Sequence, residues 1–154
     1  MKKLLFVCTG NLCRSPLAEG YFKDLLKKDY QKRFHVSSAG THGTPGAKPP
    51  LEACQVAVEN GFDISNHLAT FLSRKVIDDA DMIFAMENGH LESVLLLAPK
   101  AKSKTFLLSQ WNRLKGYGKD IPDPIGKPLK TYQECLKQIM ACVDGLFENL
   151  TNGK

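Results

Sequence analysis

One short segment near the N-terminus brings together residue types that suit chemistry on an anion. It runs Cys8-Thr9-Gly10-Asn11-Leu12-Cys13-Arg14-Ser15-Pro16. A cysteine and an arginine separated by five residues are a weak signal alone. Here an apolar run precedes the pair and a helical pattern follows it, so the segment is predicted to be a loop between a strand and a helix.

A loop that wraps around a helix N-terminus points backbone N–H groups at one spot, where the helix dipole also favours an anion such as phosphate. The planar guanidinium of Arg14 matches two phosphate oxygens. The same positive field favours the thiolate of Cys8, the nucleophilic form. Ser15 is suited to donate a hydrogen bond to that sulfur. We therefore predict phosphoryl chemistry, with Cys8 as nucleophile and Arg14 as phosphate clamp.

The rest of the phosphate-binding loop is predicted to consist of Thr9, Gly10, Asn11, Leu12, Cys13 and Ser15. Two other kinds of phosphate-binding loop are excluded because the residues that define them are missing here. A Lys-Ser/Thr pair would close a Walker A motif, and a dinucleotide fingerprint would need a different glycine pattern.

The predicted elements place this loop at one edge of a sheet. Strands are expected at 4–7, 34–38, 82–86 and 105–108, and helices from 15, at 51–60 and at 90–97, with a final helix from Tyr132 to Leu150. Gly61 is predicted to end the second helix, and Pro99 to end the third. The segments 40–50 and 112–130, rich in Gly and Pro, are predicted loops.

This alternation predicts an α/β fold, a three-layer domain with a four-stranded parallel sheet flanked by helices on both faces. Ligands of such sheets bind at the carboxyl ends of the strands, where the Cys8 loop would lie. The length of 154 residues suits one domain spanning residues 1–154.

The bulk composition adds further expectations. The net charge of +5 favours anionic ligands without indicating nucleic acid. The densest basic cluster, Lys27, Lys28, Lys32 and Arg33, is interrupted by other residues and is expected to be a solvated helix end. No apolar run approaches a membrane span or a signal peptide, so we expect a cytoplasmic protein without membrane contact, and a monomer.

The cysteines and histidines show no framework or metal-ligand spacing. The five cysteines are an odd number with no Cys-x-x-Cys pair, and the four histidines are scattered. We therefore expect neither a disulfide-stapled fold nor a metal site. Cys135 and Cys142 flank the apolar stripe of the last helix and are expected to be core residues.

Residues 8–16 resemble the N-terminal signature of low-molecular-weight protein tyrosine phosphatases, Cys-x-Gly-Asn-x-Cys-Arg-Ser-Pro. The resemblance covers the whole chain. It extends to Ser38-Ala39-Gly40-Thr41, to His67-Leu68-Ala69, and to Asp123-Pro124. It implies that His67 and Ser38 support the loop, His67 through Asn11, and that Asp123 is the general acid.

The resemblance implies a two-step, metal-independent reaction without a cofactor. Cys8 attacks phosphorus while Asp123 protonates the leaving oxygen, and Asp123 then activates water to hydrolyse the phosphocysteine. Arg14 and the loop amides stabilise the phosphoryl oxygens. The expected partners are phosphotyrosine-containing proteins, with phosphate or other oxyanions in the site. A disulfide between Cys8 and Cys13 would protect the nucleophile from over-oxidation.

Three alternatives remain beside phosphotyrosine hydrolysis. Protein-arginine phosphatases of the same family have Thr at the position of Leu12, and an aliphatic residue there favours tyrosine. Arsenate reductases need additional cysteines in the middle of the chain, and none occurs between Cys54 and Cys135. The third is a non-catalytic phosphate-binding or thiol-redox module. Ile125-Gly126 replaces the aromatic residues that eukaryotic members carry after Asp-Pro.

Overall fold

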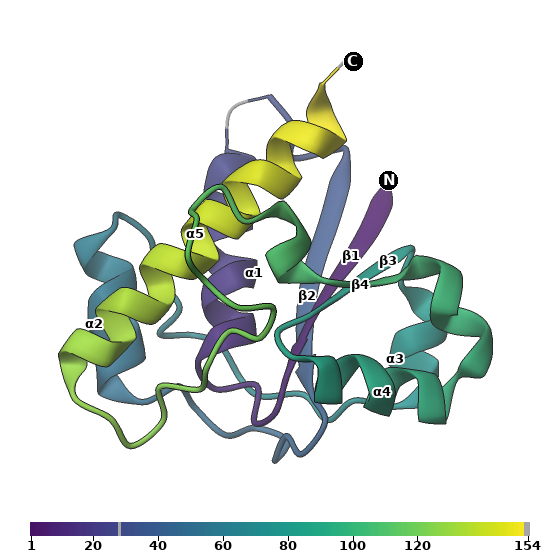
Figure 1. Cartoon of the computed structure of the whole chain (residues 1–154), viewed down its shortest axis with the longest axis horizontal. Helices are drawn as coiled ribbons and strands as arrows, with labels where there is room; N and C mark the ends of the chain where they lie inside the picture. The colour runs from purple at the N-terminus through teal and green to yellow at the C-terminus, as the bar shows by residue number, and fades with distance from the viewer. Residues whose placement is uncertain (28, 153–154) are drawn as a thin grey trace.

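Four parallel strands in the order β2-β1-β3-β4 form the centre of the computed structural model, which describes residues 1–27 and 29–152 (Figure 1). Lys28, part of the basic cluster, lies outside the described residues. The strands are β1 (Lys2–Cys8), β2 (Phe34–Gly40), β3 (Met82–Ala85) and β4 (Thr105–Leu107). The helices are α1 (Arg14–Leu25), α2 (Leu51–Glu59), α3 (Arg74–Asp79), α4 (Asn88–Leu97) and α5 (Leu129–Thr151), with 3-10 helices η1 (Pro99–Lys104) and η2 (Leu108–Trp111).

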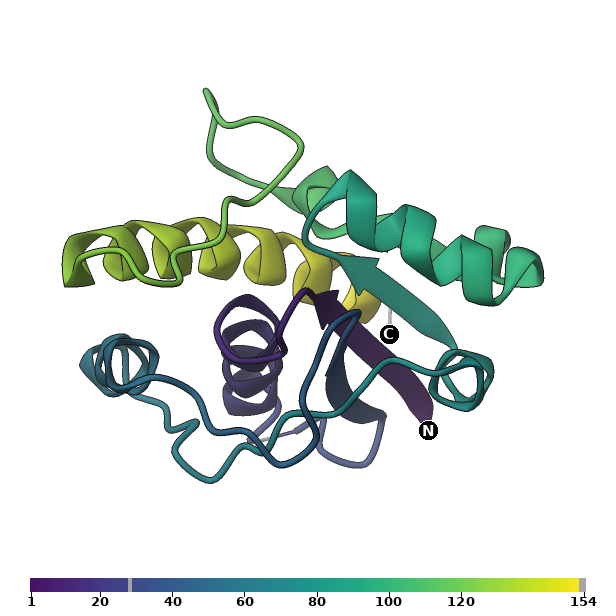
Figure 2. The same cartoon turned by 90° about the horizontal axis from the view of Figure 1, so that it is seen from below.

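Helices cover both faces of the sheet, which confirms the predicted three-layer α/β architecture. Leu4 and Phe6 of β1 pack into a core with α1, α2 and α5, whereas Leu5 and Val7 face a second core with α3 and α4. Figures 1 and 2 show these two groups of helices on opposite sides of the strands. The continuous apolar run in β1 therefore reflects a central strand that is buried on both faces.

Two features of the fold differ from the sequence-based expectations. The six-residue helix α3 was not expected, because it is too short to show an apolar period; the Ser73 side chain caps it by accepting a hydrogen bond from Val76 N at 3.2 Å. Pro99 lies beyond α4 as expected, but the chain continues directly into η1. Gly61 follows α2 with φ +87°, which fits its predicted role at the helix end.

The carboxyl ends of β1, β2 and β3 converge on the predicted loop. Residues 9–13 leave β1 and lead into α1, and Gly40 ends β2 in register with Cys8. Met86 and Glu87 follow β3, the strand on the other side of β1. Among the described residues, no helix is long and apolar enough to cross a membrane.

Candidate active site

A small cavity of about 180 Å³ at the carboxyl end of β1 collects the residues with predicted chemistry. Its lining comprises Cys8, Thr9, Gly10, Leu12, Cys13, Arg14, Asp123 and Ile125. The general acid inferred from the resemblance thus lies in the same cavity as the thiol and the guanidinium, although more than 100 residues separate them in the chain. The volume suits a phosphoryl group with part of the side chain that carries it.

The loop is built tightly against β2. The carbonyl oxygens of Cys8 and Thr9 accept hydrogen bonds from the N–H groups of Thr41 (2.9 Å) and His42 (2.8 Å). These two oxygens are therefore engaged by the end of β2 and are not left free beside an incoming anion. A side chain at Gly40 would place its Cβ 2.5 Å from Thr9 O, so only glycine permits this approach.

Asn11 is the hub of the hydrogen bonds behind the loop. It is fully buried and has φ +56°, a left-handed conformation that asparagine tolerates better than most residues. Its Oδ1 accepts from Thr70 N at 2.8 Å and from His67 Nε2 at 3.2 Å. His67 Nε2 also lies 3.0 Å from Asn11 O; a carbonyl oxygen only accepts, so this nitrogen carries the proton.

The side-chain amide nitrogen of Asn11 determines which way the hydrogen bond between Ser15 and Cys8 is directed. Its Nδ2 donates to Ser15 Oγ at 2.7 Å and to Ser38 Oγ at 2.9 Å. The Ser38 hydroxyl in turn donates a hydrogen bond to the Glu19 carboxylate at 2.5 Å. Since Ser15 Oγ already accepts from Asn11, its proton is available to Cys8 Sγ, 2.9 Å away. This arrangement can stabilise a thiolate both before attack and when it leaves.

Arg14 is held by contacts that leave one donor free. Its side chain is 1% exposed; Nη1 donates to the Glu87 carboxylate and, at 2.7 Å, to Ile121 O. Nη2 lies 3.5 Å from Asp123 Oδ2. Its Nε is the one buried side-chain nitrogen or oxygen without a hydrogen-bond partner in the described part of the chain. A buried, unpaired donor on a residue that lines an anion-sized cavity points to an anionic ligand.

His90 connects α4 to the loop. Its Nδ1 accepts from Glu87 N at 3.0 Å, so the neutral ring carries its proton on Nε2 and donates to Thr9 Oγ1 at 2.8 Å. Burial, followed by the positive charge of Arg14, lowers its pKa from 6.5 to about 4. The carboxylates of Glu87, Asp120 and Asp123 oppose this shift only in part. His90 is therefore neutral throughout the physiological range.

Cys13 and Cys135 lie near the nucleophile but are held as thiols. Burial is the main cause that raises the pKa of each to about 12, with the Asp123 carboxylate adding to it. The Sγ of Cys135 lies 3.8 Å from Pro122 O. All five cysteines are free in this structure. Within the described residues, no group of three or more His, Cys, Asp or Glu side chains is arranged to hold a metal ion.

The structure brings every predicted site residue to this region, in two layers. Seven of them line the cavity together with Ile125, and Asn11, Ser15, Ser38 and His67 form the hydrogen-bonded layer behind the loop. The sequence alone does not predict Glu19, Glu87 or His90 as residues of the site. An acidic residue directly after a buried strand is a signal that would have found Glu87, whereas Glu19 and His90 have no such marker.

A thiol and an arginine in an anion-binding loop at the end of a parallel strand define a cysteine-dependent phosphatase site. The family model described as low molecular weight phosphotyrosine protein phosphatase matches residues 3–154. The chain belongs to this family.

Known proteins with two substrate classes are similar to the chain. A protein from Klebsiella pneumoniae described as a low molecular weight protein-tyrosine-phosphatase is 35% identical over 88% of both chains. A protein-arginine-phosphatase from Geobacillus stearothermophilus is also 35% identical, over 96% of this chain and 95% of its own. The solved structure of Wzb from Vibrio vulnificus in complex with benzylphosphonate matches with a TM-score of 0.85 and 31% identity, covering 96% of this chain and 98% of that one.

Proposed function

We propose that the protein hydrolyses phosphotyrosine in proteins, and small aryl phosphates, through a phosphocysteine intermediate. The observation that carries this proposal is the cavity shared by Cys8, Arg14 and Asp123, beside the unpaired Nε of Arg14. The benzylphosphonate bound by the Vibrio relative, an aryl-methyl phosphonate, supports an oxyanion in the equivalent cavity. We further propose that residues 1–154 form one catalytic domain.

In the first step the Cys8 thiolate attacks phosphorus, so that the S–P bond forms as the ester P–O bond breaks. The carboxyl proton of Asp123 moves to the departing oxygen, and tyrosine leaves neutral. Arg14 binds the phosphoryl oxygens through its free Nε–H and stabilises the charge that develops on them. Glu87 keeps the guanidinium in place and partly neutralises its buried charge.

In the second step water attacks the phosphocysteine. Asp123, now a carboxylate, accepts the proton of the water, and the S–P bond breaks to release phosphate. The departing Cys8 sulfur again receives the hydrogen bond from Ser15 Oγ, 2.9 Å away. A thiol nucleophile requires a compartment in which thiols stay reduced, which supports a cytoplasmic location.

The second candidate is a protein-arginine phosphatase that uses the same chemistry. It is favoured by the Geobacillus relative, whose identity of 35% equals that of the Klebsiella relative. Against it stand the aliphatic side chains of Leu12 and Ile125, which line the cavity and offer apolar contact to a phenyl ring. The two substrates share the phosphoryl site, so they differ in what lies beyond it.

The test is steady-state hydrolysis of matched phosphotyrosine and phosphoarginine peptides, with chelator present throughout. We expect wild type to prefer phosphotyrosine, Cys8→Ser to be inactive and Asp123→Ala to lose about 10²-fold or more in kcat. The controls Cys54→Ser and Asp63→Ala remove a thiol and a carboxylate outside the cavity and should retain wild-type rates. Preference for phosphoarginine would favour the second candidate, and full activity of Cys8→Ser would refute the mechanism.

A further inference from the structure

A second, larger cavity of about 590 Å³ lies beside the last strand of the sheet. We name it the β4 groove; it is lined by Leu91, Thr105, Phe106, Leu107, Ser109, Gln110, Tyr117, Gly118 and Lys119. It shares no lining residue with the phosphate cavity, which is less than a third of its volume. The phosphate cavity has room for the phosphoryl group and part of the side chain that carries it, so a protein substrate must also contact surface outside it.

The β4 groove follows an unpaired strand edge. The sheet order β2-β1-β3-β4 leaves β4 with one strand neighbour among the described residues. Successive side chains of a strand point to opposite faces, yet all three residues of β4, Thr105, Phe106 and Leu107, line the groove. The groove therefore runs along the edge, where the backbone N–H and C=O groups can pair with an added strand.

The side chains of the groove suit an extended segment that is partly apolar and partly acidic. Phe106 provides an apolar wall that is packed against Trp111 with ring centroids 5.7 Å apart. Tyr117 is 38% exposed and lies in the loop that projects from the body after η2 (Figure 2). Lys119 is the one charged residue in the lining, and the lining includes no carboxylate to neutralise it.

A short stretch of the chain, residues 119–123, links the lining of the β4 groove to the lining of the phosphate cavity. At its start, Lys119 O accepts from Ser109 Oγ at 2.5 Å. Two residues on, Ile121 O accepts from Arg14 Nη1 at 2.7 Å, and Asp123 then enters the phosphate cavity. Lys119 and Asp123 are four residues apart, so their Cα atoms lie within about 14 Å of each other, a distance that an extended substrate segment of about four residues can span.

We propose that the β4 groove binds an extended, acidic segment of the phosphoprotein substrate, which adds to β4 as a further strand. This inference rests on the proposed function and extends it. It states that the preferred substrates have an acidic segment in an extended conformation beside the phosphotyrosine. Backbone pairing supplies general affinity, while Lys119 and the wall formed by Phe106 and Tyr117 select the flanking side chains.

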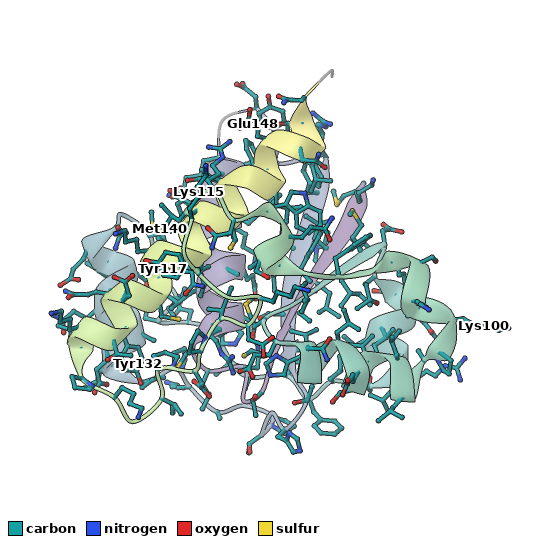
Figure 3. All side chains as sticks on the ribbon, in the orientation of Figure 1. Lys100, Lys115, Tyr117, Tyr132, Met140 and Glu148 are labelled. Atoms are coloured by element: carbon teal, nitrogen blue, oxygen red, sulfur yellow. The ribbon has the colours of Figure 1, made fainter. Side chains whose placement is uncertain are left out.

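The first test compares phosphotyrosine peptides in which a single glutamate is moved through each flanking position of an alanine background. Glutamate at one or two adjacent positions should raise kcat/KM by about threefold to fivefold, the gain typical of an exposed ion pair. Lys119→Gln should abolish this gain. Lys100→Gln makes the same change in charge on η1, far from Tyr117 in Figure 3, and should keep it.

A second test addresses the backbone pairing. Methylation of single peptide nitrogens in the preferred flank should lower kcat/KM at alternate residues only, because every second N–H of a strand faces its neighbour. Hydrolysis of p-nitrophenyl phosphate by Lys119→Gln should equal that of wild type, so loss of the peptide effect would leave the phosphatase proposal intact.

Three results would overturn the inference. One is the absence of any glutamate position that depends on Lys119, and another is methylation that has no effect or no alternation. The third is occupation of the groove by a second copy of this chain, seen as a dimer in solution that Lys119→Gln or Phe106→Ala dissociates. Inactivity of wild type toward both p-nitrophenyl phosphate and all peptides would instead refute the proposed function.

Discussion

The two sides of the phosphate cavity are held in contrasting ways. On the side of α1, the loop is fixed by buried side chains: Asn11 is 0% exposed and joins residues from three segments, among them Ser15, Ser38 and His67. On the opposite side, Asp123 has two polar contacts among the described residues: it accepts a hydrogen bond from Ile125 N at 3.1 Å, and it lies 3.5 Å from Arg14 Nη2. Ile125 itself is 46% exposed.

This contrast separates phosphate binding from recognition of what carries the phosphate. The loop must present a fixed set of donors to a small, constant group, and a buried network achieves that. The side of Asp123 is more exposed, and in the proposed mechanism it meets the variable part of the substrate. Proteins similar to this chain are described as phosphatases for tyrosine and for arginine, so the substrate class varies among them.

The largest effect is expected from Gly40→Ala on the loop side. The added Cβ would lie 2.5 Å from Thr9 O and 2.8 Å from Asn11 N, so the loop must move away from β2. Because several oxyanion donors move together, kcat/KM should fall by at least about 10³-fold. Gly89→Ala, where a Cβ meets nothing within 4 Å, should keep wild-type kinetics. Equal rates for the two variants would show that the tight packing of the loop is not required.

The next effect concerns the pH dependence of the free energy of unfolding. It depends on His90 of α4, which donates a hydrogen bond to Thr9 of the loop. The folded protein lowers its pKa from 6.5 to about 4, so the unfolded chain binds more protons between these values. The free energy of unfolding should therefore fall by about 3 kcal/mol as pH falls through this window. Chemical denaturation of His90→Gln should lack this component, whereas His35→Gln, at an exposed position, should retain it. Parallel pH profiles for wild type and His90→Gln would contradict the assignment.

Asn11→Gly tests the hub without straining the backbone, because glycine adopts φ +56° freely. Loss of the side chain removes the bond that orients the Ser15 proton toward Cys8. We expect kcat to fall by about 10²-fold with a smaller change in KM, measured with p-nitrophenyl phosphate. Asn66→Gly, at an exposed position, is the matched control. If the variant binds phosphate normally and turns over substrate at the wild-type rate, Asn11 does not orient the Ser15 proton as described here.

The smallest effect is expected on the open side. Ile125→Ala shortens an apolar wall of the cavity, so KM for a phosphotyrosine peptide should rise by about fivefold, which corresponds to about 1 kcal/mol, while kcat changes little. Leu96→Ala, 84% exposed on α4, should have no effect. If Ile125→Ala instead lowered kcat as strongly as Asn11→Gly, the two sides would not differ in the way described here.

The parts of the site that the sequence predicts are those formed by one continuous segment, and the parts that it does not predict depend on contacts between distant residues. Cys8 to Pro16 is one continuous segment, so its loop, helix start and chemistry follow from residue order. The apolar run at Leu4 and the stripe from Tyr132 predict β1 and α5 through periodicity. Glu87 and His90 act through tertiary contacts to Arg14 and Thr9, and such contacts cannot be predicted from the spacing of residues in the sequence. Asp123 was found only through the resemblance, because an Asp-Pro pair otherwise predicts a turn.

The proposed mechanism transfers the phosphoryl group to Cys8, and rapid-quench mass spectrometry can detect this phosphocysteine. During turnover of p-nitrophenyl phosphate, wild type should carry a phosphate adduct on the peptide that contains Cys8 and Cys13. Cys13→Ser should retain the adduct, and Cys8→Ala, which has no nucleophilic atom, should lose both the adduct and the activity. Turnover by wild type without any adduct, or an adduct that disappears in Cys13→Ser and persists in Cys8→Ala, would contradict this mechanism.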